Sequence, residues 1–103
     1  MITAEIERQA DKLKAVAHPT RIGILEILRG GEECVCRIYP AVPGSQPNTS
    51  KHLAVMKKAG IVDSRQEGQM TFYWVKDESV YKVLEFAREM VRRERTSGIR
   101  QVG

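Results

Sequence analysis

The sequence is poor in the residues that build metal clusters and disulfide frameworks. It has two cysteines and two histidines among 103 residues. Because Cys34 and Cys36 are separated by one residue, a disulfide between them would close a loop too small to brace a fold, and we expect a reduced pair. Two histidines are too few for a catalytic metal site, and we find neither a nucleophile-base motif nor a glycine-rich phosphate loop. The sequence therefore predicts a protein that is not an enzyme and has no permanent cofactor.

Long hydrophobic runs are also absent. No segment approaches the roughly 18 apolar residues of a membrane span, and the charged first turns lack the apolar core of a signal peptide. We therefore expect a cytoplasmic protein without a membrane partner. With 4 prolines and 8 glycines, the composition is that of an ordinary folded protein. A single domain of this size has a small core and would gain from a partner subunit.

The first half of the chain predicts four helices. Apolar residues recur at three- and four-residue steps over residues 2–17, and a second, more apolar helix begins at Pro19 and ends before Gly30. Residues 32–39 predict a short third helix that Pro40 limits. After a turn, Ser45 is the expected N-cap of a fourth helix that reaches Lys58.

The second half predicts a hairpin and a last helix. Residues 61–66 and 70–76 are strand-like and flank a tip at residues 67–69, and helical periodicity returns from Asp77. This order of elements predicts a mainly α fold with a small β-hairpin wing, a winged helix-turn-helix. We expect residues 1–96 to form one domain for DNA binding and dimerisation, and residues 97–103 to form a flexible basic tail.

Polar side chains concentrate on the fourth helix. The net charge of +4 has its positive excess in residues 45–76 and 88–103. Amide, hydroxyl, amine and imidazole groups suit base edges and phosphates in a major groove, and the hairpin adds two more polar groups near its tip. The candidate DNA-binding residues are Gln46, Asn48, Thr49, Ser50, Lys51, His52, Arg65 and Gln69. The alternative interpretations are a solvated helix face and a winged-helix module that binds only proteins.

Four ordered motifs resemble the ArsR/SmtB family of metal-responsive winged-helix repressors. They are Ala17-His18-Pro19-Thr20-Arg21, Glu33-Cys34-Val35-Cys36, Ser45 through Leu53, and Lys58-Ala59-Gly60-Ile61-Val62 with the Glu67-Gly68 wing. The resemblance implies a homodimer built from the first and last helices. It also implies that the fourth helix of each subunit binds a palindromic operator in double-stranded DNA and that an inducer releases the repressor.

The cysteine pair is the candidate inducer site. The Cys34-Val35-Cys36 arrangement resembles the arsenite, antimonite, cadmium or lead site of the family's third helix, in which arsenite-responsive relatives often add a third cysteine where this chain has Tyr39. Cadmium and lead sites in the family draw on further cysteines from an N-terminal extension, so the resemblance favours As(III) or Sb(III) over Cd(II) or Pb(II). A hydroxide or an exogenous thiol would complete the arsenic coordination.

The spacing of the two cysteines also predicts how a ligand would act. Residues two apart on a regular helix point about 200° from each other, so an ion held by both sulfurs would distort the third helix. Ligand binding and DNA binding would then favour different conformations. A thiol-redox switch and a purely structural role as small buried side chains are the alternatives.

Overall fold

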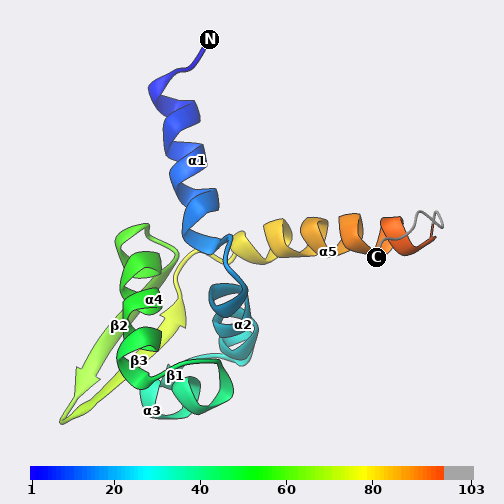
Figure 1. Ribbon diagram of the computed structural model, residues 1–103. Coiled ribbons are helices and arrows are strands. Elements are labelled where there is room, and N and C mark those ends of the chain that lie inside the picture. The colour runs from blue at the N-terminus through cyan, green and yellow to red at the C-terminus, as the bar shows by residue number, and fades with distance from the viewer. Residues whose placement is uncertain (97–103) are drawn as a thin grey trace.

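The computed structural model describes residues 1–96, and its elements follow the order of a winged helix-turn-helix (Figure 1). A body of helices and a small sheet carries two helices, the first and the last, that extend away from it in different directions (Figure 1). The expected tail at residues 97–103 lies outside the described residues. The elements are α1 (Ala4–Val16), α2 (Pro19–Ile27), η1 (Leu28–Gly30), β1 (Glu33–Cys34), α3 (Val35–Ile38), η2 (Tyr39–Ala41), α4 (Gln46–Lys58), β2 (Val62–Glu67), β3 (Met70–Val75) and α5 (Val80–Thr96).

The long helices of the body begin where side chains satisfy their first backbone N–H groups. Nδ1 of His18 accepts from the Thr20 N–H at 3.1 Å at the start of α2, and Oγ of Ser45 accepts from the Asn48 N–H at 3.3 Å at the start of α4. Pro19 and Pro47 occupy the first turns, where a missing N–H costs nothing. The predicted starts of both helices, with Ser45 as a cap, are confirmed.

The core lies between α2, α3, α4 and the sheet. Its fully buried side chains are Ile24, Leu25, Ile38, Leu53, Met56, Val62 and Thr49. Ile22 of α2, an apolar residue of the helix predicted from Pro19, is 37% exposed. The helix therefore buries a narrower stripe than its composition indicates.

The sheet has three antiparallel strands in the order β1-β3-β2. The wing is confirmed: β2 and β3 pair from Val62 and Val75 to Glu67 and Met70, and Gly68 at φ +63° supplies the left-handed conformation of the two-residue turn. The helix predicted over residues 32–39 is wrong at its beginning. Glu33 and Cys34 are extended and pair with β3, because this pairing satisfies an otherwise open strand edge, and the helix starts only at Val35.

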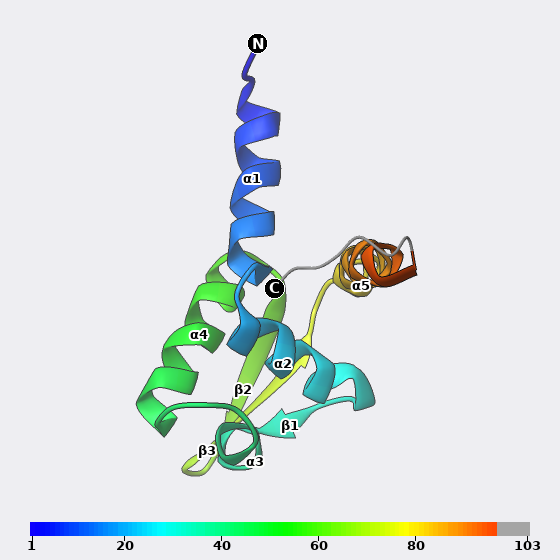
Figure 2. The same cartoon turned by 45° about the vertical axis from the view of Figure 1, so that its right-hand side comes forward.

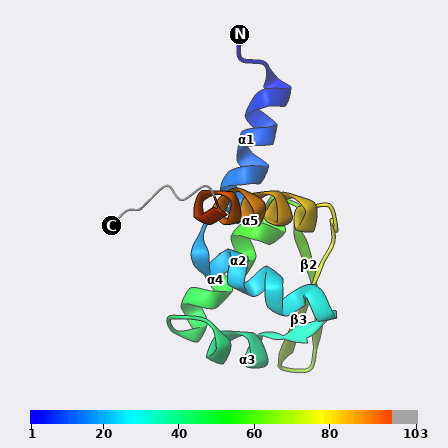
Figure 3. The same cartoon turned by 90° about the vertical axis from the view of Figure 1, so that its right-hand side faces the viewer.

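The two protruding helices keep most of their apolar side chains outside the core. In α1 only Ala15 and Val16 are buried, and Leu13 is 52% exposed. Helix α5 is anchored by Tyr81, whose hydroxyl donates to the Leu25 carbonyl oxygen at 2.7 Å; burial raises the pKa of this phenol to about 12. Val80 and Leu84 are buried beside it. Beyond Leu84, α5 extends away from the body (Figures 1 and 2), and it crosses in front of the body in the view of Figure 3; Phe86 is 67% exposed. None of the helices within residues 1–96 is both long enough and apolar enough to cross a bilayer.

Candidate nucleic-acid interface and cysteine site

Helix α4 presents its polar N-terminal half to solvent. Gln46, Asn48, Ser50 and Lys51 are exposed, whereas Leu53 and Met56 pack into the core. The turn before the helix is fixed by Gly44 at φ +97°, where an added Cβ would lie 2.7 Å from Nδ2 of Asn48. The four exposed side chains are therefore held on one rigid element, as groove recognition by a helix requires.

The structure removes Thr49 from the predicted set of DNA-binding residues. Its side chain is fully buried, and its hydroxyl has no hydrogen-bond partner in the described structure. Position 49 follows Asn48 by one residue, and this step of about 100° turns the side chain from the exposed face to the core. Thr49 belongs to the core and not to the interface.

His52 is half-buried and faces α2 as well as solvent. Its Nδ1 accepts a hydrogen bond from Nε of Arg21 at 3.0 Å, and its ring centroid lies 4.5 Å from that of His18. Burial, followed by the charges of His18 and Arg21, lowers the pKa of His52 below 6.5. The neutral imidazole therefore joins α4 to α2, a contact between distant residues that local sequence does not reveal.

The wing arginine is held by carboxylates. Nε and the second terminal nitrogen of Arg65 donate to the two carboxylate oxygens of Glu32 at 2.8 and 3.0 Å, and the other terminal nitrogen donates to Glu67 at 3.1 Å. The guanidinium also covers the ring of Phe72, 4.6 Å from its centroid. These contacts lower the pKa of Glu32. Arg65 thus ties the wing to the segment that enters β1, while Gln69 is exposed at the wing tip.

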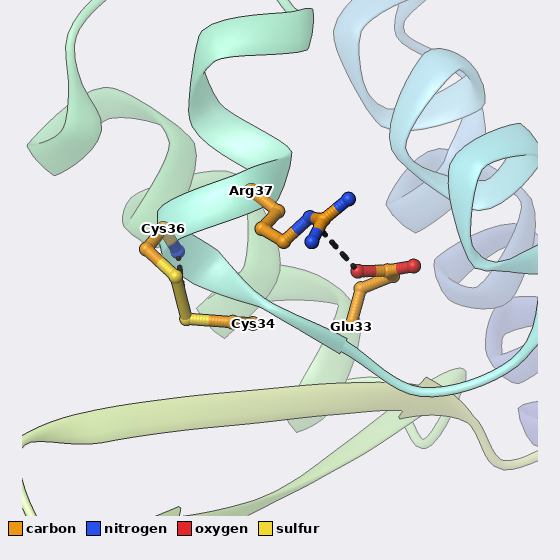
Figure 4. The surroundings of a disulfide bond; sticks show 4 residues. All are labelled: Glu33, Cys34, Cys36 and Arg37. Atoms are coloured by element: carbon orange, nitrogen blue, oxygen red, sulfur yellow. Dashed lines mark hydrogen bonds and ion pairs between the residues drawn. A yellow bond between two sulfur atoms is a disulfide. The ribbon is translucent and has the colours of Figure 1, made fainter.

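The two cysteines lie where β1 becomes α3. Cys34 is 4% exposed and forms the N-cap of α3, with its Sγ accepting from the Cys36 N–H at 3.1 Å. Cys36 is exposed in the first turn of that helix. The sulfurs are joined in a disulfide across a Cα–Cα distance of 5.1 Å, beside an ion pair of Arg37 with Glu33 at 3.9 Å (Figure 4).

This geometry corrects two expectations about the pair. The reduced pair expected from the sequence is a disulfide in the structure. The divergence of about 200° is also wrong, because it applies only when both residues are helical, and Cys34 has extended backbone angles, φ −72° and ψ 142°. Both sulfurs meet at one point without any unwinding of α3.

A cavity of about 150 Å³ adjoins the cysteines. It lies between the start of α3, the start of α4 and the wing, and its lining includes Cys34, Cys36, Gln46, Ser50, Gln69 and Tyr73. The structure thus brings both predicted sulfur ligands together with three of the predicted DNA-binding residues. The contribution of Tyr73 was missed in the sequence. It follows from the pairing of β1 with β3, and a two-residue strand is too short to show the alternation that identifies strands.

The structure also shows whether other side chains join the two predicted ligands, Cys34 and Cys36. Within residues 1–96, no group of three or more histidine, cysteine, aspartate or glutamate side chains is arranged to hold a metal ion. Tyr39, which stands where a third cysteine was considered, is half-buried in η2. The candidate site therefore supplies two sulfur ligands and no third acidic, histidine or cysteine ligand.

Sequence comparison relates the chain to bacterial and archaeal regulators. Residues 18–64 match the model for the arsR family of bacterial regulatory proteins. An uncharacterized HTH-type transcriptional regulator of Methanocaldococcus jannaschii is 40% identical over 82% of this chain and 96% of the relative. An arsenic resistance transcriptional regulator of Pseudomonas putida is 44% identical, over 58% of this chain and 48% of the relative. A cadmium resistance regulatory protein homolog of Staphylococcus aureus is 35% identical over 76% of this chain and 65% of the relative.

Structural comparison gives the same grouping. The homodimeric winged helix-turn-helix DNA-binding domain of a possible ArsR-family regulator from Mycobacterium bovis aligns with a TM-score of 0.75 and 27% identity. The alignment covers 97% of this chain and 92% of the other. The winged helix-turn-helix architecture predicted from the sequence is confirmed.

Proposed function

Because the chain belongs to the ArsR family of bacterial regulatory proteins and is a DNA-binding transcriptional regulator rather than an enzyme, we propose that it is a repressor released from its operator by trivalent arsenic or antimony. The inducer binds to the thiolates of Cys34 and Cys36. A homodimer formed through α1 and α5 places two copies of α4 on a palindromic operator. Gln46, Asn48, Ser50 and Lys51 contact base edges and phosphates there, and Gln69 contacts the backbone from the wing. His52 and Arg65 are further contacts only if their present partners give way to phosphates.

The observation that carries this proposal is the shared cavity. Soft thiolate ligands favour thiophilic ions, and here they lie beside Gln46 and Ser50 of α4 and Gln69 of the wing. An ion bound to both sulfurs occupies space next to the groups that DNA must reach. Inducer and operator then compete for one surface, which is the differential binding that release requires.

Arsenic and antimony are favoured over cadmium and lead by the number of ligands. Trivalent arsenic forms three bonds and needs only one ligand beyond the two sulfurs. Cadmium favours four ligands and would need two more, and the family's cadmium and lead sites draw on further cysteines; residues 1–96 offer no three-ligand cluster of histidine, cysteine, aspartate or glutamate. The arsenic and cadmium resistance relatives make both classes reasonable inducers to compare.

A thiol-redox switch is a second candidate function, and the disulfide between Cys34 and Cys36 favours it. In this alternative, oxidation of the pair, and not binding of an ion, changes the affinity for DNA. The two candidates make different demands on the thiols, because arsenite binds only the reduced pair.

The test is a fluorescence anisotropy titration of the reduced protein with the promoter fragment upstream of its own gene. We expect sequence-specific binding that weakens with added salt, followed by release when arsenite or antimonite is added. Cys34→Ser and Cys36→Ser proteins should bind the fragment as the parent does and should stay bound in arsenite. If both variants release DNA as readily as the parent, the cysteine site is wrong.

Zinc and peroxide serve as comparisons in the same assay. Release by peroxide alone, reversed by a reductant and lost in both serine variants, would favour the redox alternative. Cadmium or lead acting at lower concentration than arsenite would assign the site to those ions.

A further inference from the structure

The cysteine site is incomplete as a trivalent arsenic site. Arsenic(III) forms three bonds, and Cys34 and Cys36 provide two of them. No histidine, cysteine or acidic side chain within residues 1–96 joins them in a three-ligand cluster. A third ligand of these types therefore comes from outside the described chain, and the surroundings of the sulfurs decide what kind of ligand fits.

The cavity beside the sulfurs has the size and polarity of a small organic group. Its volume of about 150 Å³ is that of a protein cavity that holds a molecule of about six heavy atoms. Its lining is more polar than apolar: Gln46 and Gln69 offer amide groups, Ser50 a hydroxyl and Tyr73 a phenol, while Val35 and Met70 add apolar surface. Such a lining matches hydroxyl, amine or carboxylate substituents, whereas a hydroxide on arsenic would leave most of the space to water.

We propose that this cavity binds a low-molecular-weight thiol that completes the arsenic coordination, so that the effective inducer is arsenic(III) held by Cys34, Cys36 and one small thiol. This inference rests on the proposed function. The thiol sulfur bonds to arsenic, and its polar substituent contacts Gln46, Ser50 and Gln69.

The chemistry balances without further reactants. Two equivalents of the small thiol first reduce the Cys34–Cys36 disulfide, giving two protein thiols and the disulfide of the small thiol. Arsenous acid, As(OH)₃, then reacts with the two protein thiols and one small thiol. Three As–S bonds form, three As–O bonds break, three waters leave, and arsenic remains in the +3 state.

A thiol bound in the cavity would also couple arsenite binding to release of the DNA. Gln46, Ser50 and Gln69 are at once walls of the cavity and candidate DNA contacts. A thiol substituent that engages these side chains competes directly with the operator for them. A small thiol should therefore strengthen arsenite-induced release and not merely permit it by keeping the cysteines reduced.

The experiment uses the full chain, reduced with a phosphine that carries no thiol and then titrated with arsenite with or without 2-mercaptoethanol. Native mass spectrometry and arsenic X-ray absorption report the stoichiometry and the atoms bound to arsenic. We expect one 2-mercaptoethanol retained per arsenic, three sulfur neighbours, and arsenite affinity at least about tenfold higher than without the thiol. In the phosphine alone we expect two sulfurs and one oxygen.

A matched pair of variants assigns the effect to the cavity. Ser50 and Ala54 are both exposed on α4, one turn apart, but only Ser50 lines the cavity. Ser50→Trp fills the cavity and should abolish the thiol enhancement while leaving two-sulfur binding of arsenite. Ala54→Trp should behave as the parent does.

The outcomes separate this inference from the proposed function. If the reduced parent fails to bind arsenite under either condition, the proposed function is wrong. If arsenite binds with two sulfurs and one oxygen whether or not thiol is present, or if Ser50→Trp keeps the full enhancement, the thiol site is wrong and the two-cysteine sensor stands.

Discussion

At the scale of single residues, Thr49 and Cys34 show how one step along the chain changes a role. Thr49 sits in a polar stretch of α4 but points into the core, and Cys34 precedes a helix but is itself extended. The backbone direction turns the side chain of Thr49 away from its predicted task, whereas the extended backbone of Cys34 brings its sulfur to that of Cys36. Where a residue stands around the helix axis, and whether it precedes the helix, decides where its side chain points; residue type alone does not.

The buried hydroxyl of Thr49 gives a prediction about stability. It has no hydrogen-bond partner, and an unsatisfied buried hydroxyl is unfavourable. Thr49→Val keeps the side-chain shape and should raise the free energy of unfolding by about 1 kcal/mol in urea denaturation. Affinity for the promoter fragment should not change.

Ser50→Ala is the control for this variant. Its side chain is exposed, so its removal should leave stability unchanged within about 0.5 kcal/mol. A Thr49→Val protein that is no more stable than the parent and binds the promoter fragment at least tenfold more weakly would return Thr49 to the DNA interface.

At the scale of elements, the position of α4, the proposed DNA-reading helix, is set by one turn and two side-chain contacts. The Gly44 turn fixes where α4 begins, Arg65 joins the wing to the entrance of β1, and His52 joins α4 to α2 through Arg21. The Gly44 turn reverses the chain direction, and the other two contacts link segments far apart in sequence. Together they hold α4, the wing and the cysteine segment in one arrangement.

The contact of His52 predicts a pH dependence. Its folded pKa lies below 6.5, so the folded protein binds fewer protons than the unfolded chain in the window below that value. The stability that the neutral imidazole provides is present above pH 6.5 and is lost as the pH falls through the folded pKa. Protonation would place a charge beside His18 and Arg21 and remove the acceptor for Arg21.

The measurement is the free energy of unfolding in urea between about pH 7.5 and about pH 5.5 for the parent and for His52→Gln. The amide oxygen of glutamine can still accept from Arg21 but does not titrate in this range. We expect a smaller loss of stability on acidification in the variant. Equal losses in the two proteins would show that another group controls the acid response.

At the scale of the whole molecule, α1 and α5 are the parts that the monomer leaves uncovered. Ile2, Ile6 and Leu13 of the first segment and Val83, Phe86, Met90 and Val91 of the last helix are exposed. Several exposed apolar side chains on the same helix are typical of an interaction face. A homodimeric relative of the same fold supports a second copy of this chain as the partner.

This face gives a prediction about assembly. Phe86 is the most exposed of the large apolar side chains recorded on α5, and burying a phenylalanine contributes about 1.5–3 kcal/mol. Phe86→Glu should therefore raise the dimer dissociation constant at least about tenfold and weaken operator binding. Light scattering coupled to size-exclusion chromatography measures the change in mass.

Arg88→Glu introduces the same side chain about 200° around the helix and serves as the control. It should leave the dimer intact. If Phe86→Glu elutes with the same mass as the parent, or if both variants dissociate equally, the exposed face of α5 is not the dimer interface.

The sequence by itself determined the order of elements, because caps, prolines, glycines and periodicity act over a few residues. Ser45 and Pro47 start the fourth helix and Gly68 closes the wing, as predicted. The same local signals identified the polar stretch of α4 and the cysteine pair as the residues to examine.

The tertiary structure alone decided how these parts meet. Pairing of Glu33 and Cys34 with Tyr73 and Phe72 draws the cysteine segment onto the sheet, and this turns both sulfurs into a cavity shared with α4 and the wing. Such pairing depends on contacts between residues nearly 40 positions apart, and a two-residue strand has no pattern of its own. Local sequence therefore shows which groups are present, whereas long-range packing decides which of them can act on one ligand.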